Sequence, residues 1–199
     1  PDSWTVERSV LEVLNSLNRW LFGRRSSTSS YLCTLSMMVM RGRMYHIFHV
    51  GDTRIYLWRG GKLTRLTEDH HYPGHENRLV RAMGLDRVVR ADVSEGHIEK
   101  DDVFIMTTDG VHACLKDEDM IPILRQNFQS QMLAVKLCQL GLEKGHGDNS
   151  TVQVLSVKEL PLPHRSEMID EERYLKAAPE LNNGNVLDGY RIIQRMTSG

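Results

Sequence analysis

The alternation of apolar and polar residues predicts one N-terminal helix, then a series of short strands, then two further helices. In residues 3–22, apolar side chains recur every three or four positions, which is the spacing of an amphipathic helix. The apolar positions are Val6, Val10, Leu14, Leu17 and Leu21. We therefore predict a helix over residues 3–22 that buries these side chains on one face.

Strand patterns follow this helix along the chain. Residues 53–67 alternate on both sides of Gly60–Gly61, which is a strong β-hairpin signal. Further strands are predicted over residues 31–40, 44–50, 88–93, 103–108 and 150–157. Helical patterns predict one or two turns over 78–84 and longer helices over 117–127 and 129–144.

Hairpin strands segregated from a helix pair are typical of the α+β class. The chain has neither the βαβ alternation nor the glycine-rich phosphate loop of a doubly wound parallel sheet. After Leu160 the sequence becomes polar and rich in proline, as in a linker, and a strand pattern returns only near the C-terminus. We expect one domain over residues 1–158, a linker over 159–188 and the start of another element over 189–199.

Composition and charge exclude several classes of partner. The formal net charge is -1, so no overall field favours nucleic acid or an anionic membrane. No apolar run approaches the roughly 20 residues that cross a bilayer, so we expect no membrane segment in this chain. Cys33, Cys114 and Cys138 are odd in number and lack CxxC spacing. Reduced thiols and a cytoplasmic location are therefore expected.

Three aspartates share one local pattern. Asp52 and Asp109 each follow an apolar strand, and Asp148 lies just before the strand that begins at Ser150. Each aspartate has a glycine within one or two positions, and Asn149 adds a neutral oxygen beside Asp148. Convergent carboxylates would repel one another unless a hard cation such as Mg²⁺ or Mn²⁺ lay among them. From spacing alone, ordinary turn chemistry is the simpler explanation of these residues.

Three histidines lie close together in the polar loop after the hairpin. His70, His71 and His75 have a spacing that could bind zinc on a helical turn, but Pro73–Gly74 interrupts any helix there. We therefore expect solvated loop histidines.

Four stretches in a fixed order carry a more specific signal. They are "HVGDTRIYLWRGGKLTRLTEDHH", "RAMG", "DDVFIMTTDGV" and "GDNSTVQVL". Together they resemble the metal-dependent (type 2C) serine/threonine protein phosphatases in their bacterial form, over about residues 3–158. The family patterns there are GDSR with a hairpin ending in T-x-DH, then RA-x-G, SDG and DN. The resemblance implies a sandwich of two antiparallel β-sheets flanked by antiparallel helix pairs.

Residue by residue, the resemblance implies a metal centre at the three aspartates. Asp109 and Asp148 match ligands of a binuclear Mn²⁺ or Mg²⁺ centre, and Asp52 matches a residue that helps hold a third, weaker metal in bacterial relatives. Gly51 and Gly110 match glycines that let the backbone turn, and Asn149 completes the DN pair. The implied reaction is attack of a metal-activated water on phosphoserine or phosphothreonine of a phosphoprotein substrate.

The resemblance is incomplete at the N-terminus. The family carries a DG-x-GG motif whose aspartate bridges both metals and an arginine that contacts the phosphate. The only DG pairs in this chain are Asp109–Gly110 and Asp188–Gly189, and the first residue is Pro1. We expect an N-terminally incomplete domain that binds metal poorly and is inactive on its own. It is either a piece of an active enzyme or a degenerate domain that serves as a scaffold or sensor.

The C-terminal stretch "GNVLDGYRIIQRMTSG" resembles the entry into a serine/threonine protein kinase domain. This resemblance implies a bacterial phosphatase–kinase fusion, in which residues 189–199 begin a kinase domain of the same polypeptide. A scaffold or sensor domain would then regulate the attached kinase. The chain has no kinase catalytic residues, so no kinase activity is expected from it.

Overall fold

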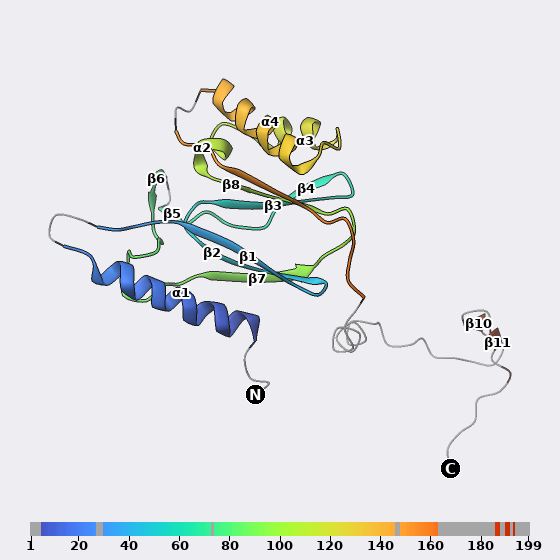
Figure 1. Ribbon diagram of the computed structural model, residues 1–199, viewed down its shortest axis with the longest axis horizontal. Coiled ribbons are helices and arrows are strands. Elements are labelled where there is room, and N and C mark those ends of the chain that lie inside the picture. Colours follow the sequence, from blue (N-terminus) through green and yellow to red (C-terminus); the bar gives the residue numbers. More distant parts are fainter. Residues whose placement is uncertain are drawn as a thin grey trace, which may run out of the picture. The chain divides into compact units, whose positions relative to one another are not determined.

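The computed structural model of the chain describes residues 5–26, 30–72, 74–145, 148–162, 186–187, 190–191 and 193 (Figure 1). The chain divides into two compact units, residues 1–161 and 162–199. In the second unit, β10 (Val186–Leu187) pairs antiparallel with β11 (Tyr190–Arg191). Most of the predicted linker and kinase-like segment lies outside the described residues, so these boundaries stay predictions.

The first unit contains four helices and nine strands among its described residues. The helices are α1 (Val6–Gly23), α2 (Asp109–His112), α3 (Asp117–Leu124) and α4 (Ser130–Glu143). The strands are β1 (Leu35–Arg41), β2 (Met44–Val50), β3 (Arg54–Arg59), β4 (Lys62–Arg65), β5 (His71–Tyr72), β6 (His75–Leu79), β7 (Asp92–His97), β8 (Val103–Thr107) and β9 (Val152–Ser156). None of the described helices combines the length and hydropathy that a membrane-spanning helix needs.

Two antiparallel sheets form the centre of this unit, as Figure 1 shows. One sheet has the strand order β1-β2-β7 and the other has the order β4-β3-β8-β9. Three apolar clusters separate the layers. Leu14 of α1 packs with Phe48, Tyr45 meets Phe104 between the sheets, and Leu137 of α4 packs with Ile105. The predicted α+β sandwich with flanking helices is confirmed.

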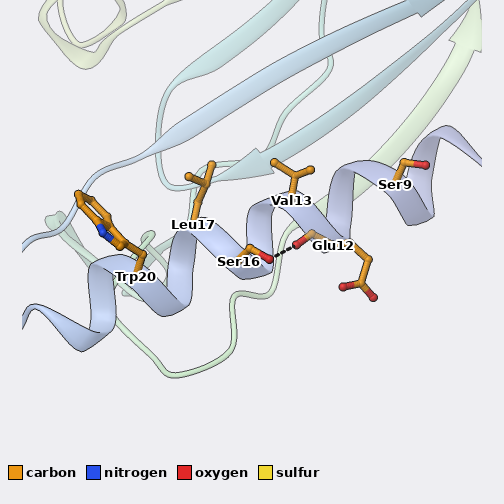
Figure 2. A pocket seen from close by; sticks show the side chains of 6 residues that line it. All are labelled: Ser9, Glu12, Val13, Ser16, Leu17 and Trp20. Atoms are coloured by element: carbon orange, nitrogen blue, oxygen red, sulfur yellow. Dashed lines mark hydrogen bonds between the residues drawn. The ribbon is translucent and has the colours of Figure 1, made fainter.

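Helix α1 begins at a side-chain cap. The Thr5 hydroxyl accepts the backbone N–H of Arg8, which satisfies one of the free donors of the first turn. Leu14 is fully buried against the sheet, as predicted. The prediction that Leu17 shares this face is wrong, because its side chain is 48% exposed and lies beside Val13 and Trp20 (Figure 2).

The hairpin at Gly60–Gly61 is confirmed. Both glycines have positive φ, 56° and 81°, as the tight turn between β3 and β4 requires. The short helix predicted over 78–84 is wrong, because β5 and β6 form a hairpin in this region. Met83 instead makes an isolated antiparallel bridge with Cys33, and Gly84 turns the chain with φ of 80°. Without an apolar stripe to bury, a stretch this short gains too little from helix formation.

Candidate functional site

The predicted site residues emerge from one end of the sheet β4-β3-β8-β9. In that sheet Arg54 of β3 lies opposite Thr107 of β8, and Thr107 lies opposite Val152 of β9. Asp52 precedes β3, Asp109 follows β8 and Asp148 precedes β9. Because neighbouring strands in this sheet run in opposite directions, all three predicted aspartates lie at the same end of the sheet.

The segments that carry Asp109 and Asp148 are joined directly. The Thr108 N–H donates to the carbonyl of Thr151 at 3.2 Å, and the Thr151 N–H donates to Thr108 Oγ1 at 3.0 Å. The Ser150 hydroxyl donates to the carbonyl of Gly110 at 2.9 Å. These bonds fix the residues next to both aspartates, although the aspartates lie far apart in sequence.

Gly110 is required by close approach rather than by an unusual turn. It lies inside helix α2 and is not among the described glycines with positive φ. A Cβ at this position would lie 2.4 Å from the carbonyl oxygen of Asn149, which is a backbone atom that cannot swing aside. The expectation that Gly110 lets the backbone turn is therefore corrected. The residue allows the two segments to touch.

Asp52 belongs to a different set of contacts. Its carboxylate lies 3.3 Å from Nε2 of His71, at the start of β5. Gly51, just before it, has φ of 111°, and a Cβ there would lie 2.4 Å from the Thr34 side chain. Gly51 therefore needs to be glycine for both its conformation and its space.

Two buried histidines, His70 and His49, form hydrogen bonds with backbone groups of Gly51 and Glu68. His70 is only 6% exposed, so the expectation of a solvated histidine is wrong at this position. Its Nδ1 accepts the backbone N–H of Gly51 at 3.1 Å, and its Nε2 donates to Asp92 at 3.0 Å. His49 donates from Nε2 to the carbonyl of Glu68 at 2.9 Å. His70 therefore ties the turn at Gly51 to β7, and His49 ties β2 to the segment that follows β4.

Sequence reasoning missed this role because a histidine gives the same local pattern whether it is solvated or buried. A signal for His49 was present, since it lies on the face of its strand that carries Tyr45 and Ile47, both buried. Burial and the neighbouring His70 lower the pKa of His49, which keeps its ring neutral.

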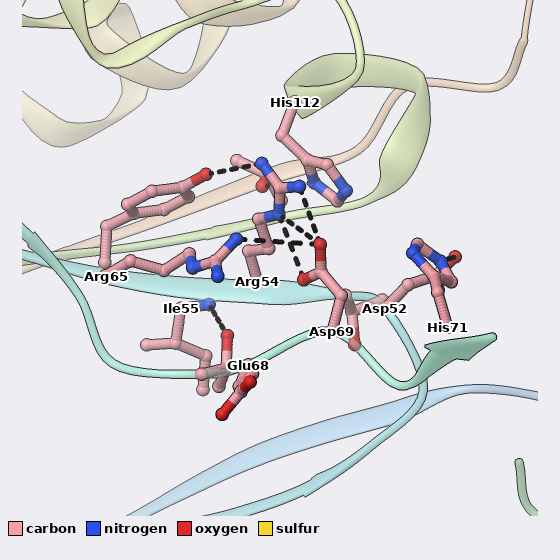
Figure 3. A network of polar contacts seen from close by, with 12 residues as sticks. Asp52, Arg54, Ile55, Arg65, Glu68, Asp69, His71 and His112 are labelled. Carbon is pink, nitrogen blue, oxygen red and sulfur yellow. Dashed lines mark hydrogen bonds and ion pairs between the residues drawn. The ribbon is translucent and has the colours of Figure 1, made fainter. Parts of the chain in front are cut away.

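A guanidinium–carboxylate pair lies beside this loop (Figure 3). Arg54 donates to both oxygens of Asp69, with distances of 3.1 Å from Nε to Oδ1 and 2.6 Å from Nη2 to Oδ2. Arg65 is also directed at Asp69, but at 3.6 Å and with a more exposed side chain. Burial alone would raise the pKa of Asp69, yet the bonds from Arg54 bring it below its usual value.

His112 ends α2, the short helix that begins at Asp109. Its Nδ1 lies 3.1 Å from the Thr107 hydroxyl, and its side chain is almost fully buried. Burial, together with the positive charge of Arg54, lowers the pKa of His112 from 6.5 to about 4. The imidazole is therefore neutral at physiological pH.

We expect His112 to make the fold sensitive to acid. An unfolded chain takes up a proton at this residue below about pH 6.5, while the folded chain resists it until about pH 4. The free energy of unfolding should therefore fall by roughly 2–3 kcal/mol from this residue as the pH drops through that window. Urea unfolding between pH 7.5 and pH 4 measures the slope. His112→Gln should flatten it, and the exposed-site variant His75→Gln should not. An equal slope in all three proteins would contradict this assignment.

The chemistry of Asp109 and Asp148 suits a hard cation. Both residues are exposed, and each carboxylate accepts the backbone N–H of the next residue. No ion pair joins either carboxylate to a cationic side chain within the described ranges. Two carboxylates fit Mg²⁺ or Mn²⁺ in ligand type, but such an ion prefers about six oxygen ligands.

The described residues do not complete such a ligand set. Among them, no group of three or more His, Cys, Asp or Glu side chains is placed to hold a metal ion. A centre that also includes Asp52 therefore stays a prediction. Any further ligands would come from water, substrate or residues beyond those described.

Comparison with known proteins gives a family match to most of the first unit. The family model described as Protein phosphatase 2C matches residues 4–139. The serine/threonine protein phosphatase PstP of Mycobacterium tuberculosis is 26% identical over 142 residues, covering 62% of this chain and 27% of that protein. The chain therefore spans about a quarter of the length of that curated relative.

Solved structures agree with the fold. The serine/threonine phosphatase of S. agalactiae has a TM-score of 0.71 and 22% identity, covering 80% of this chain and 74% of that one. The catalytic domain of PstP, solved in complex with two manganese ions, has a TM-score of 0.69 and 23% identity, with the same coverage of 80% and 74%. At such identities the likeness concerns the fold.

Proposed function

The chain belongs to the protein phosphatase 2C family, and from this premise we propose that it serves the hydrolysis of phosphoserine and phosphothreonine on proteins. The observation that carries the proposal is the joined pair of segments holding Asp109 and Asp148. Two exposed carboxylates that have no cationic partner among the described residues, anchored to one sheet end, are suited to a divalent cation.

The proposed division of roles follows from these contacts. Asp109 and Asp148 would hold Mn²⁺ or Mg²⁺, and Asp52 would assist a further ion. When bound, such ions lower the pKa of water and neutralise charge on a phosphoryl group. Gly51, Gly110 and Asn149 keep the supporting backbone in place, and Mn²⁺ is favoured because PstP was solved with two manganese ions.

A second candidate function is a phosphatase-like scaffold or sensor without catalysis. The observation that favours it is the lack, within the part of the chain the structure describes, of a group of three metal-ligating side chains. In this proposal the domain would regulate a protein kinase domain that follows it in the same bacterial signalling polypeptide. A cytoplasmic location is proposed for both functions.

A phosphate-release assay tests the catalytic proposal. The natural polypeptide that carries these residues should release phosphate from a phosphothreonine peptide when Mn²⁺ is added, and EDTA should stop the release. The matched phosphotyrosine peptide serves as the control and should stay intact. Calorimetric titration with Mn²⁺ accompanies the assay. Absence of both metal binding and phosphate release would reject catalysis and favour the scaffold.

A further inference from the structure

Asp52 lies in the turn between β2 and β3, and its side chain is only 17% exposed. Its carboxylate contacts Nε2 of His71 at 3.3 Å (Figure 3). One contact of this length does not determine the direction in which a carboxylate points. The backbone on either side of Asp52 therefore decides where its oxygens lie.

The residue before Asp52 is held twice by His70. The backbone N–H of His70 donates to the carbonyl of Gly51 at 2.8 Å, and its Nδ1 accepts the N–H of Gly51 at 3.1 Å. These bonds hold the two peptide groups on either side of the Gly51 Cα. The second of these peptide groups leads directly into Asp52, so His70 restricts how the turn can rotate.

The form of the His70 ring follows from its partners. A backbone N–H can only donate, so Nδ1 must accept and the ring hydrogen lies on Nε2. Nε2 donates to one oxygen of Asp92 at 3.0 Å, and Nη1 of Arg81 donates to the other oxygen. Nη1 also lies 3.3 Å from Nε2, but both nitrogens carry hydrogen, so this is only a contact. Asp92 and Arg81 therefore hold His70 in the tautomer that Gly51 requires.

The residue after Asp52 is held by a second chain of hydrogen bonds. The hydroxyl oxygens of Thr53 and Ser36 lie 2.6 Å apart, and Ser36 Oγ lies 2.8 Å from Nδ1 of His49. Because Nε2 of His49 donates to the carbonyl of Glu68, its Nδ1 must accept. The single hydrogen of Ser36 therefore goes to His49, and Thr53 donates to Ser36. His49 thus holds Thr53 through Ser36.

The two histidines form one buried unit below the turn. His49 and His70 are 1% and 6% exposed, and their ring centroids lie 4.8 Å apart. Each ring uses both nitrogens in hydrogen bonds. At this degree of burial, water does not readily replace a lost bond, so each ring keeps one orientation.

We infer that His70 and His49 are positioning residues, which hold the backbone on both sides of Asp52 and so orient its carboxylate for a divalent cation. The inference rests on the proposed function, in which Asp52 assists a further ion. Groups that orient a metal ligand commonly change metal affinity about ten- to hundredfold when they are removed. The effect should therefore appear in the Mn²⁺ concentration that the protein requires, and much less in turnover at saturating Mn²⁺.

Two substitutions at His70 separate positioning from packing. The side-chain oxygen of asparagine can take the place of Nδ1, so His70→Asn keeps an acceptor for the Gly51 N–H. The amide of glutamine reaches the place of Nε2, so His70→Gln keeps the bond to Asp92 and loses the acceptor. Both variants remove the ring. His70→Gln should raise the Mn²⁺ requirement about tenfold or more, and His70→Asn about threefold or less.

The measurements use the natural polypeptide that carries these residues. Calorimetry gives the half-saturation of the weaker Mn²⁺ sites, and phosphate release gives turnover at saturating Mn²⁺. His46→Gln and His46→Asn are the control pair, because His46 is a partly buried histidine that pairs with Glu95 at 3.2 Å. Both controls should match the unmodified protein. Urea unfolding of each variant measures any general loss of stability.

Hydrogen exchange of the Gly51 N–H gives a readout that needs neither metal nor activity. NMR of the metal-free protein should show exchange at least about tenfold faster in His70→Gln than in His70→Asn, because only the first lacks the acceptor. Packing of the ring alone would affect both variants equally.

Thr53 tests the second chain without disturbing either histidine. Thr53→Val keeps the shape of the side chain but removes the hydroxyl, and it should raise the Mn²⁺ requirement several-fold, to about tenfold. Thr53→Ser keeps the hydroxyl and should match the unmodified protein. This pair also applies if a substitution at His70 prevents folding.

The outcomes distinguish this inference from the proposed function. Mn²⁺ binding by the unmodified protein, with equal Mn²⁺ requirements in His70→Gln and His70→Asn and in Thr53→Val and Thr53→Ser, would overturn the positioning role alone. An unmodified protein that binds no Mn²⁺ would overturn the proposed function and the role of Asp52 toward a cation.

Discussion

Asp109→Asn is expected to abolish Mn²⁺-dependent phosphate release, by on the order of a hundredfold or more, because a metal ion contributes several kcal/mol to such a reaction. In the unmodified protein, Asp109 Oδ1 accepts a hydrogen bond from the Gly110 N–H at 2.9 Å. Asparagine has the same size, and its side-chain oxygen can still accept this hydrogen bond. The substitution removes only the negative charge, which is what a hard cation requires. Kinetics across a Mn²⁺ titration measure the loss.

Asp101→Asn is the matched control for this substitution. Asp101 is exposed and lies just before β8, whereas Asp109 lies just after it, so the two aspartates are at opposite ends of one strand. Asparagine also tolerates the φ of 68° found at Asp101. We expect full activity in this control and a second loss in Asp148→Asn. Unchanged turnover in Asp109→Asn would contradict the assignment of this residue as a ligand.

Arg54→Met is expected to lower the free energy of unfolding by about 3 kcal/mol, because it leaves a largely buried carboxylate without its main partner. The side chain of Asp69 is 12% exposed and accepts three short contacts from the Arg54 guanidinium. Methionine retains much of the apolar stem, so the loss reports on charge and hydrogen bonding. Urea unfolding at neutral pH measures it.

Arg65→Met separates this effect from a general loss of positive charge. Arg65 reaches the same carboxylate at 3.6 Å from a side chain that is 39% exposed, so its removal should cost less than about 1 kcal/mol. Arg54→Met should also raise the pKa of His112, which the Arg54 charge helps to lower. NMR titration of His112 gives that second readout. Equal destabilisation by the two variants would contradict the proposed pairing.

The sheets and the position of the aspartates could be predicted because strand patterns are local. The alternation around Gly60–Gly61 determines which residues face inward, and each aspartate is adjacent in sequence to the strand that carries it. Short stretches of sequence were therefore enough to predict that each aspartate lies at the end of a strand. A local sequence pattern does not contain the distances between the three carboxylates, so it cannot show whether they bind one metal centre.

The contacts below the site could not be predicted, because they join residues far apart in the chain. The buried His70 forms hydrogen bonds with Gly51 and Asp92, and the sequence of the loop around it does not distinguish a buried histidine from an exposed one. The buried face of helix α1 was also predicted only in part. A repeat of three and four residues fits more than one face of the helix, so the pattern predicted the helix but placed Leu17 on the wrong side.

The bonds between Thr108 and Thr151 also determine when the site forms during folding. They close a loop of 43 residues that contains helices α2, α3 and α4. Loop-closure entropy makes such distant contacts late, so the hairpin of β3 and β4 can form well before the sheet end that holds the aspartates. Destabilising this junction should then accelerate unfolding more than it slows folding. The proposed metal-binding edge would exist only in chains in which β9 has docked.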